Sequence, residues 1–319
     1  RQMCIRDRYR TTRDQIDVIA CTAAELGSRR IGWSVGRSWI EYKSDLPNQH
    51  PFPCVPYEEA RKSPTYPKSD TWDYGPRIRM QQQEFDPLRV VFDRRRTCGL
   101  EIWPWLAMQR HYGLEFYGGM FACPFYRDNK QWWRYAKNGA HAAGLSFYYP
   151  EVRKERVDIL VETAERGADG VLVGCDRQVP MLLYDPDMVE EYRKKTGVDP
   201  RTIDASNGKA YQDWIRWRAG FFTLLLRELR HRLEAVEAKQ GRRIPVAVRF
   251  PVAGLFLSMA QGVDIETWCR EGLIDRMQLD PLEDLAGKGS QDVRPYLELG
   301  RRYGVTVVAG VGGTGFMYE

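Results

Sequence analysis

The sequence has no long apolar run and few histidines. No apolar stretch approaches the roughly 20 residues that a membrane-spanning helix needs, so we expect no membrane partner. No GxGxxG follows a predicted strand and no GxxxxGK[ST] occurs, which disfavours the common nucleotide-binding folds. There are four histidines in 319 residues, and no HxH or similar ligand spacing. We therefore predict neither a metal site nor an organic cofactor, although carboxylate-bound magnesium stays open.

The cysteines do not form a recognisable framework. There are seven of them, an odd number, at positions 4, 21, 54, 98, 123, 175 and 269, and no CxxC occurs. This spacing suggests neither a zinc site nor a disulfide framework, and we expect most of them to be small core residues. A thiol nucleophile at Cys175 would need an activating base, and no histidine is close to it in sequence.

The positive charge is weak and dispersed. The formal net charge is +5, and residues 1–8 (RQMCIRDR) contribute three arginines against one aspartate. We therefore predict no nucleic-acid partner. Residues 1–8 also resemble translated sequencing-adaptor sequence, so we treat them as artefactual and residues 9–319 as a single incomplete domain. The chain stops soon after an apolar run at 305–311, so we expect both ends to be truncated. Cellular location and oligomeric state are left open.

The middle of the chain contains its clearest βα pattern. A predicted helix starts at Pro150, where a missing N–H costs nothing, and stops at Gly167. The apolar run 170–174 is too short for a helix and fits a strand buried on both faces, as in a parallel sheet. It leads directly to Asp176 and Arg177. Charged residues just after a parallel strand are where α/β barrels place their chemistry, although an ordinary ion pair is the simpler reading.

The same alternation runs through the whole chain. Strands are predicted at 31–38, 100–107, 170–174, 245–250, 274–279 and 305–311. Helices are predicted at 11–26, 86–98, 150–166, 187–195, 207–239, 264–271 and 292–303. Two long connections, at 43–85 and 113–145, separate the early elements, and the second is rich in aromatic residues. We therefore predict an α/β fold: a (β/α)₈ TIM barrel, truncated at both ends, with long aromatic-rich βα loops.

In such a barrel the strand ends meet at one rim. That rim would carry Trp39, Glu41, Trp105, Gln109, Arg110, His111, Asp176, Arg177, Arg249, Asp280 and Glu283. Aromatic rings stack on the apolar faces of sugars, while carboxylates and arginines bond to the hydroxyl groups. The chain has 10 Trp and 17 Tyr, although about half of the loop rings could instead pack as small cores of their own. We expect a carbohydrate substrate at this rim.

Paired carboxylates on one rim suit the cleavage of a glycosidic bond, in which one protonates the leaving oxygen and the other attacks carbon or activates water. Asp176 is our candidate for the nucleophile or base, with Arg177 favouring its ionised form. Asp280 or Glu283 is the candidate acid. The other rim residues named above are candidate substrate-binding groups.

Three segments carry a resemblance to a known family. They are YPEVRKERVDILVETAERGADGV, VRFP and GVDIETWCREGLIDRMQLDP. From about residue 86 to 311 the chain resembles the family-10-like glycosyl hydrolases, barrels of environmental bacteria. The family's strand motif runs roughly D-G-[IV]-x-L-D-x-x-R-x-P, and Asp169, Gly170, Val171 and Arg177 match it.

The chain differs from the family motif at one important position. The family's inner acidic residue falls on Gly174, while Asp176 has the same strand parity and could point to the same face. The resemblance implies a bacterial, exported protein that cleaves a poly- or oligosaccharide without a cofactor. A catalytically inactive carbohydrate-binding barrel is the alternative that Gly174 favours. A lyase or aldolase that uses His111 is a further alternative, and no predicted strand end offers a lysine for Schiff-base chemistry.

Overall fold

The computed structural model describes residues 2–3, 12–47, 49–68, 78, 84–109, 111–176, 178–280 and 292–309. Three of the predicted rim residues, Arg110, Arg177 and Glu283, lie outside these ranges.

A parallel sheet forms the centre of the protein. Its strands are β1 (Gln2–Met3), β2 (Arg30–Gly36), β3 (Glu101–Ala107), β6 (Val171–Gly174), β7 (Val246–Pro251), β8 (Arg276–Asp280) and β9 (Thr306–Ala309), in that spatial order. Every neighbouring pair is parallel, and the spatial order follows the chain. All six predicted strands are confirmed. β1, a seventh, lies within the segment that we excluded and pairs with the start of β2.

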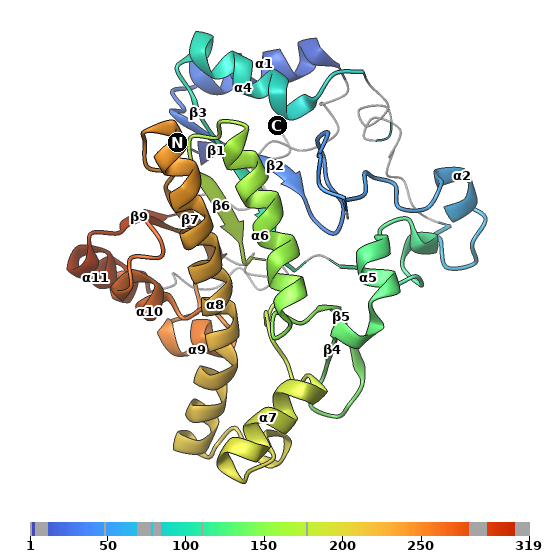
Figure 1. Ribbon diagram of the computed structural model, residues 1–319, viewed down its shortest axis with the longest axis vertical. Coiled ribbons are helices and arrows are strands. Elements are labelled where there is room, and N and C mark those ends of the chain that lie inside the picture. Colours follow the sequence, from blue (N-terminus) through green and yellow to red (C-terminus); the bar gives the residue numbers. More distant parts are fainter. Residues whose placement is uncertain are drawn as a thin grey trace.

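Helices connect the strands in the order that the sequence predicts. They are α1 (Arg13–Glu25), α4 (Pro87–Cys98), α6 (Pro150–Glu165), α7 (Pro186–Thr196), α8 (Gly208–Gln240), α10 (Ile265–Arg270) and α11 (Arg294–Tyr303). The α/β class, with its repeated parallel βα units, is therefore confirmed. Figure 1 shows α6 and α8 side by side along the sheet, where they contact each other. Among the described residues, β1 and β9 are the two ends of the row and do not pair with each other.

Several small elements were not predicted. They are the helices α2 (Tyr57–Ala60), α5 (Pro124–Asp128) and α9 (Leu255–Ala260), the 3₁₀ turns η2 (Tyr117–Gly119), η3 (Lys130–Trp132) and η4 (Pro200–Thr202), and the antiparallel strands β4 (Trp133–Tyr135) and β5 (His141–Leu145). Most of them lie inside the two long connections, which are therefore folded in part.

Local sequence explains where the main helices begin and end. At α4, the Asp86 carboxylate accepts the backbone N–H of Leu88, Pro87 occupies the first turn, and Gly99 ends the helix in the left-handed conformation. At α1, Thr12 and Gln15 form a reciprocal capping box. Side-chain acceptors of this kind satisfy backbone donors that have no partner inside the helix.

The two faces of the sheet have different surroundings. Alternate residues such as Ile102, Val173 and Val248 belong to the main core that packs against the helices. The residues between them form a small separate cluster of Trp103, Trp105, Ala107, Leu172 and Ala247 on the opposite, inner face. Strand periodicity of two requires this division. The inner face is therefore the one on which strand-end side chains can meet.

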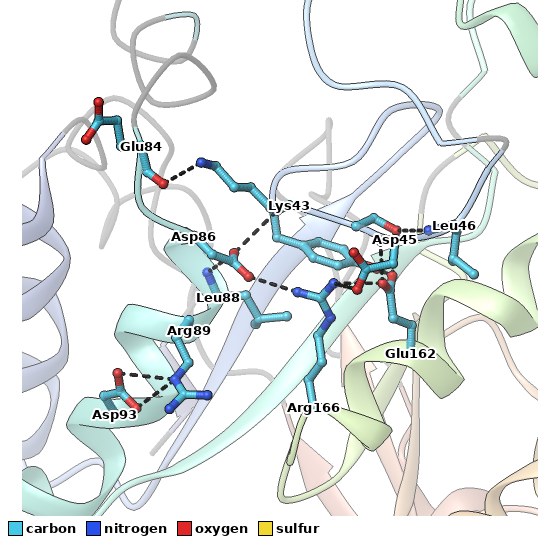
Figure 2. Close-up of polar contacts among 12 residues, drawn as sticks. Lys43, Asp45, Leu46, Glu84, Asp86, Leu88, Arg89, Asp93, Glu162 and Arg166 are labelled. Atoms are coloured by element: carbon cyan, nitrogen blue, oxygen red, sulfur yellow. Dashed lines mark hydrogen bonds and ion pairs between the residues drawn. The ribbon is translucent and has the colours of Figure 1, made fainter.

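A network of ion pairs joins the loop after β2 to two helices (Figure 2), and it runs from the buried Glu162 to the exposed Asp45. Arg166, just after α6, donates to the carboxylates of Asp86, Asp45 and Glu162, each at 2.9 Å. Glu162 also accepts the Ser44 hydroxyl at 2.6 Å and the Asp45 N–H at 2.8 Å. The network holds the start of the 43–85 connection against the C-terminal end of α6 and the N-terminal end of α4.

We expect Glu162→Ala to destabilise the protein by about 3 kcal/mol, because it leaves Arg166 without one partner and the buried Tyr42 hydroxyl without its acceptor. The measurement is the free energy of unfolding in guanidinium chloride. Glu165→Ala, an exposed position on the same helix, is the matched control and should change stability by less than about 0.5 kcal/mol. Equal effects of the two substitutions would contradict this role for Glu162.

Candidate functional site

The sheet register brings three charged side chains to neighbouring strand ends. Ala107 of β3 pairs with Gly174 of β6, and Gly174 pairs with Arg249 of β7. Asp280 ends β8 beside β7. Asp176, two residues beyond Gly174, has the parity of the inner face. The carboxyl ends of β6, β7 and β8 therefore contribute one carboxylate, one guanidinium and a second carboxylate.

Arg249 connects the two carboxylates. Its Nη2 donates to Asp280 Oδ2 at 2.8 Å, and its Nε lies 3.6 Å from Asp176 Oδ2. Since a guanidinium is small and planar, the two contacted oxygens are at most about 9 Å apart, which is compatible with the carboxyl separations of glycosidases. The Asp176 side chain is 2% exposed and that of Asp280 is 24% exposed. Asp280 is thus the more accessible acid.

Trp105 occupies the space beside Gly174. A Cβ atom added at Gly174 would come within 2.3 Å of Trp105 Nε1 and 3.0 Å of the Leu106 carbonyl oxygen. The guanidinium of Arg249 lies 5.6 Å from the centre of the Trp105 ring, within cation–π range. An indole therefore fills the position where the resembled family has its acid. This gives a physical reason for glycine at position 174, and it places Trp105 directly beneath Arg249.

Glu41 and Trp39 lie after β2. The Glu41 carboxylate is buried, accepts the Ser34 hydroxyl at 2.9 Å and lies 3.7 Å from Arg37. Trp39 is also buried, with Phe52 and Phe121 rings both 5.2 Å away. Trp39, which we predicted to bind substrate, therefore packs in a buried aromatic cluster with rings of the two long connections.

Gln109 and Arg134 hold the loop after β6. Gln109 is fully buried, and its Nε2 donates to the carbonyl oxygens of Leu145 and Met181 at 2.6 and 3.1 Å. Arg134, on β4, donates to the carbonyl oxygens of Ala143, Gln178 and Pro180. Burial lowers the pKa of Arg134 to about 10. The two side chains join the β4–β5 hairpin to the segment that follows Asp176. Arg134 could not be identified from the sequence, because its acceptors are backbone atoms distant along the chain.

His111 is buried beside other basic groups. Its ring stacks on Tyr126, with ring centres 5.6 Å apart, and its Nε2 lies 3.5 Å from Arg156 Nη2. Burial, together with the charges of Arg156 and Arg134, lowers the pKa of His111 well below its ordinary value. The imidazole is therefore neutral at physiological pH and lies in the interior.

No group of three or more His, Cys, Asp or Glu residues is arranged to hold a metal ion within the described part of the chain. No helix among the same residues is long and apolar enough to span a bilayer.

No protein-family model matches this chain, and no curated protein is similar to it in sequence. Several solved structures show a distant likeness, and they are glycoside hydrolases. A glycoside hydrolase family 18 N-acetylglucosaminidase from Paenibacillus barengoltzii has 17% identity and a TM-score of 0.37 over 70% of this chain and 55% of its own. A β-galactosidase from Bacillus circulans sp. alkalophilus has 14% identity and a TM-score of 0.42 over 86% and 38%.

The glycoside hydrolase domain of PelA from Pseudomonas aeruginosa has 10% identity and a TM-score of 0.37, covering 69% of this chain and 71% of that domain. The chain spans about half, or less, of the length of the first two proteins. The likeness to the family-10-like group in particular stays a prediction.

We expect Gly174→Asp to destabilise the protein by about 3 kcal/mol, because the new side chain must displace the Trp105 indole. The free energy of unfolding measures this cost. Gly220→Asp is the matched control, since a Cβ there meets nothing within 4 Å. In the Trp105→Ala background, Gly174→Asp should cost clearly less. Strictly additive losses would show that the two sites do not compete for the same space.

We expect His111 to make the protein sensitive to acid. The pKa of His111 is lower in the folded protein than in the unfolded chain. Below about pH 6.5 the unfolded chain therefore binds a proton at this residue that the folded chain does not bind. The free energy of unfolding then falls as the pH falls, by up to about 1.4 kcal/mol per pH unit. His111→Gln should make the fall in unfolding free energy between pH 7 and 5 shallower. His231→Gln, with a side chain 85% exposed, should leave the slope unchanged. Identical slopes in all three proteins would contradict the assignment.

Proposed function

We propose that this protein is a glycoside-hydrolase-like barrel that acts on a poly- or oligosaccharide through Asp176 and Asp280. The observation that carries the proposal is the position of the two carboxylates, which lie at the carboxyl ends of β6 and β8, on either side of β7, and contact the same guanidinium, that of Arg249 on β7. Strand ends of this kind are where parallel α/β folds place their chemistry. Their contacts with one guanidinium keep the two contacted oxygens within about 9 Å of each other, which is compatible with paired-carboxylate cleavage.

The difference in exposure suggests a role for each carboxylate. Asp280 is partly exposed, so it can reach the glycosidic oxygen and protonate it as that oxygen leaves. Asp176 lies deeper and would attack the anomeric carbon or activate water. Arg249 must then exchange part of its contact with the carboxylates for contact with the substrate. Glu283, three residues beyond Asp280, stays the alternative acid.

A second function has its own support. Asp176 is almost fully buried next to Arg249, and Trp105 fills the place of the acid that the resemblance leads us to expect. A site with this arrangement can hold sugar hydroxyls with Asp280 and Arg249 without cleaving the glycosidic bond. A carbohydrate-binding barrel without activity is therefore our second candidate. The buried, neutral His111 disfavours the lyase or aldolase alternative.

The test combines reducing-sugar release with calorimetric binding on a panel of poly- and oligosaccharides. For a hydrolase, Asp176→Asn and Asp280→Asn should each lower activity by about 100-fold or more, while substrate binding and folding stay largely intact. Asp93→Asn, at an exposed position on α4 whose partner is Arg89, is the matched control and should retain full activity.

Three other outcomes would distinguish further between the two candidate functions. Binding without turnover, weakened by Asp280→Asn, would favour the binding barrel. Full hydrolytic activity in both aspartate variants would overturn the catalytic assignment, and no binding to any carbohydrate would overturn both candidates.

A further inference from the structure

Two cysteines meet where the first two major helices pack together. Cys21 is on α1 and Cys98 is the last residue of α4, and the helices lie side by side at one end of the molecule (Figure 1). Their Sγ atoms are 3.2 Å apart, although 77 positions separate the residues in the chain. Both residues are partly exposed, so a small reagent can reach the pair.

An ion pair one helical turn away holds the two thiols in register. Arg94 Nε and Nη2 donate to the two carboxylate oxygens of Asp17 at 2.7 and 2.6 Å. Asp17 precedes Cys21 by four residues, and Arg94 precedes Cys98 by four residues. Residues four apart lie on the same face of a helix, so a bidentate contact at one turn brings the next turn of each helix together as well. The proximity of the thiols is thus part of the helix packing and not an isolated side-chain contact.

We propose that Cys21 and Cys98 are a disulfide-forming pair, which an oxidising environment converts into a covalent link between α1 and α4. This revises our expectation that the cysteines serve mainly as core residues. The link would close a loop that contains β2 and the whole 43–85 connection. Such a closure restricts the unfolded chain strongly and stabilises the fold.

The chemistry is ordinary thiol–disulfide exchange with a low-molecular-weight disulfide as oxidant. One cysteine thiolate attacks the oxidant, forms a mixed disulfide and releases one thiol. The second cysteine thiolate then attacks the mixed disulfide, forms the Cys21–Cys98 bond and releases the second thiol. Two cysteine thiols lose two electrons and two protons in total, and the oxidant disulfide is reduced to two thiols.

The local environment favours this pair over the buried cysteines. Burial raises the pKa of Cys123 and of Cys269 to about 12 in each case, and raises that of Cys175 well above the ordinary value. The hydrogen bond between the paired thiols also raises the pKa of Cys21, while Arg94 acts to lower it. Exchange should therefore be faster at pH 9 than at pH 7, since the thiolate is the reactive form.

The experiment treats the reduced full chain with oxidised glutathione at pH 8.5 and maps it after digestion with trypsin, without reductant. We expect a linked pair of peptides, 14–29 and 97–110, and a rise in Tm of roughly 5 to 12 °C that added reductant reverses. Cys21→Ser and Cys98→Ser should each abolish both signals. Cys269→Ser, the matched control, should keep them.

Two results would overturn the proposal. In one, Cys21 and Cys98 are both fully alkylated after oxidation, or carry only glutathione. In the other, Cys21 or Cys98 is recovered in a link to a different cysteine. Because the readouts are a peptide mass and a melting temperature, the outcome is independent of any action on carbohydrate.

Discussion

The arrangement of charged side chains at the strand ends depends on the contacts of the Arg249 guanidinium. It lies over the Trp105 ring and contacts Asp176 through Nε and Asp280 through Nη2. Two acidic side chains on one rim repel each other unless a cation lies between them. Trp105 in turn has room only because residue 174 has no side chain. A glycine, an indole and a guanidinium thus form a stack that holds the two carboxylates in place.

The long connections support this stack from outside. The β4–β5 hairpin lies in the second connection, and Arg134 and Gln109 tie it to the segment after Asp176. Both side chains donate to backbone carbonyl oxygens, so the contacts define the path of the loop whatever side chains it carries. Phe52 and Phe121 of the connections pack with Trp39, which precedes the first connection, and form a small core of their own. The described parts of these loops are therefore folded.

The strands and main helices could be predicted from the sequence because the signals that define them are local. Short apolar runs marked all six strands, and features such as Asp86-Pro87 and Gly99 marked helix ends. Strand parity was enough to place Asp176 on the face that Arg249 and Asp280 share. The partner of Asp176 could not be found in this way, since the Arg249 contact depends on the register between β6 and β7. For the same reason the Cys21–Cys98 contact, which depends on how two helices pack, was not predicted.

The charge balance at the rim links the two candidate functions. Among the described residues at the rim, the Arg249 guanidinium contacts two carboxylates, and its contact with Asp280 is the closer one. Breaking a buried ion pair is costly unless new hydrogen bonds replace it. A sugar that only binds can add hydroxyl contacts to Asp280 and leave the stack intact. Under the proposed hydrolysis, a sugar that is cleaved must also draw Asp176 toward its anomeric carbon, so its contacts must replace the ion pair between Asp176 and Arg249. Under the proposed hydrolysis, turnover therefore needs a substrate with enough hydroxyl groups to take over part of the role of Arg249.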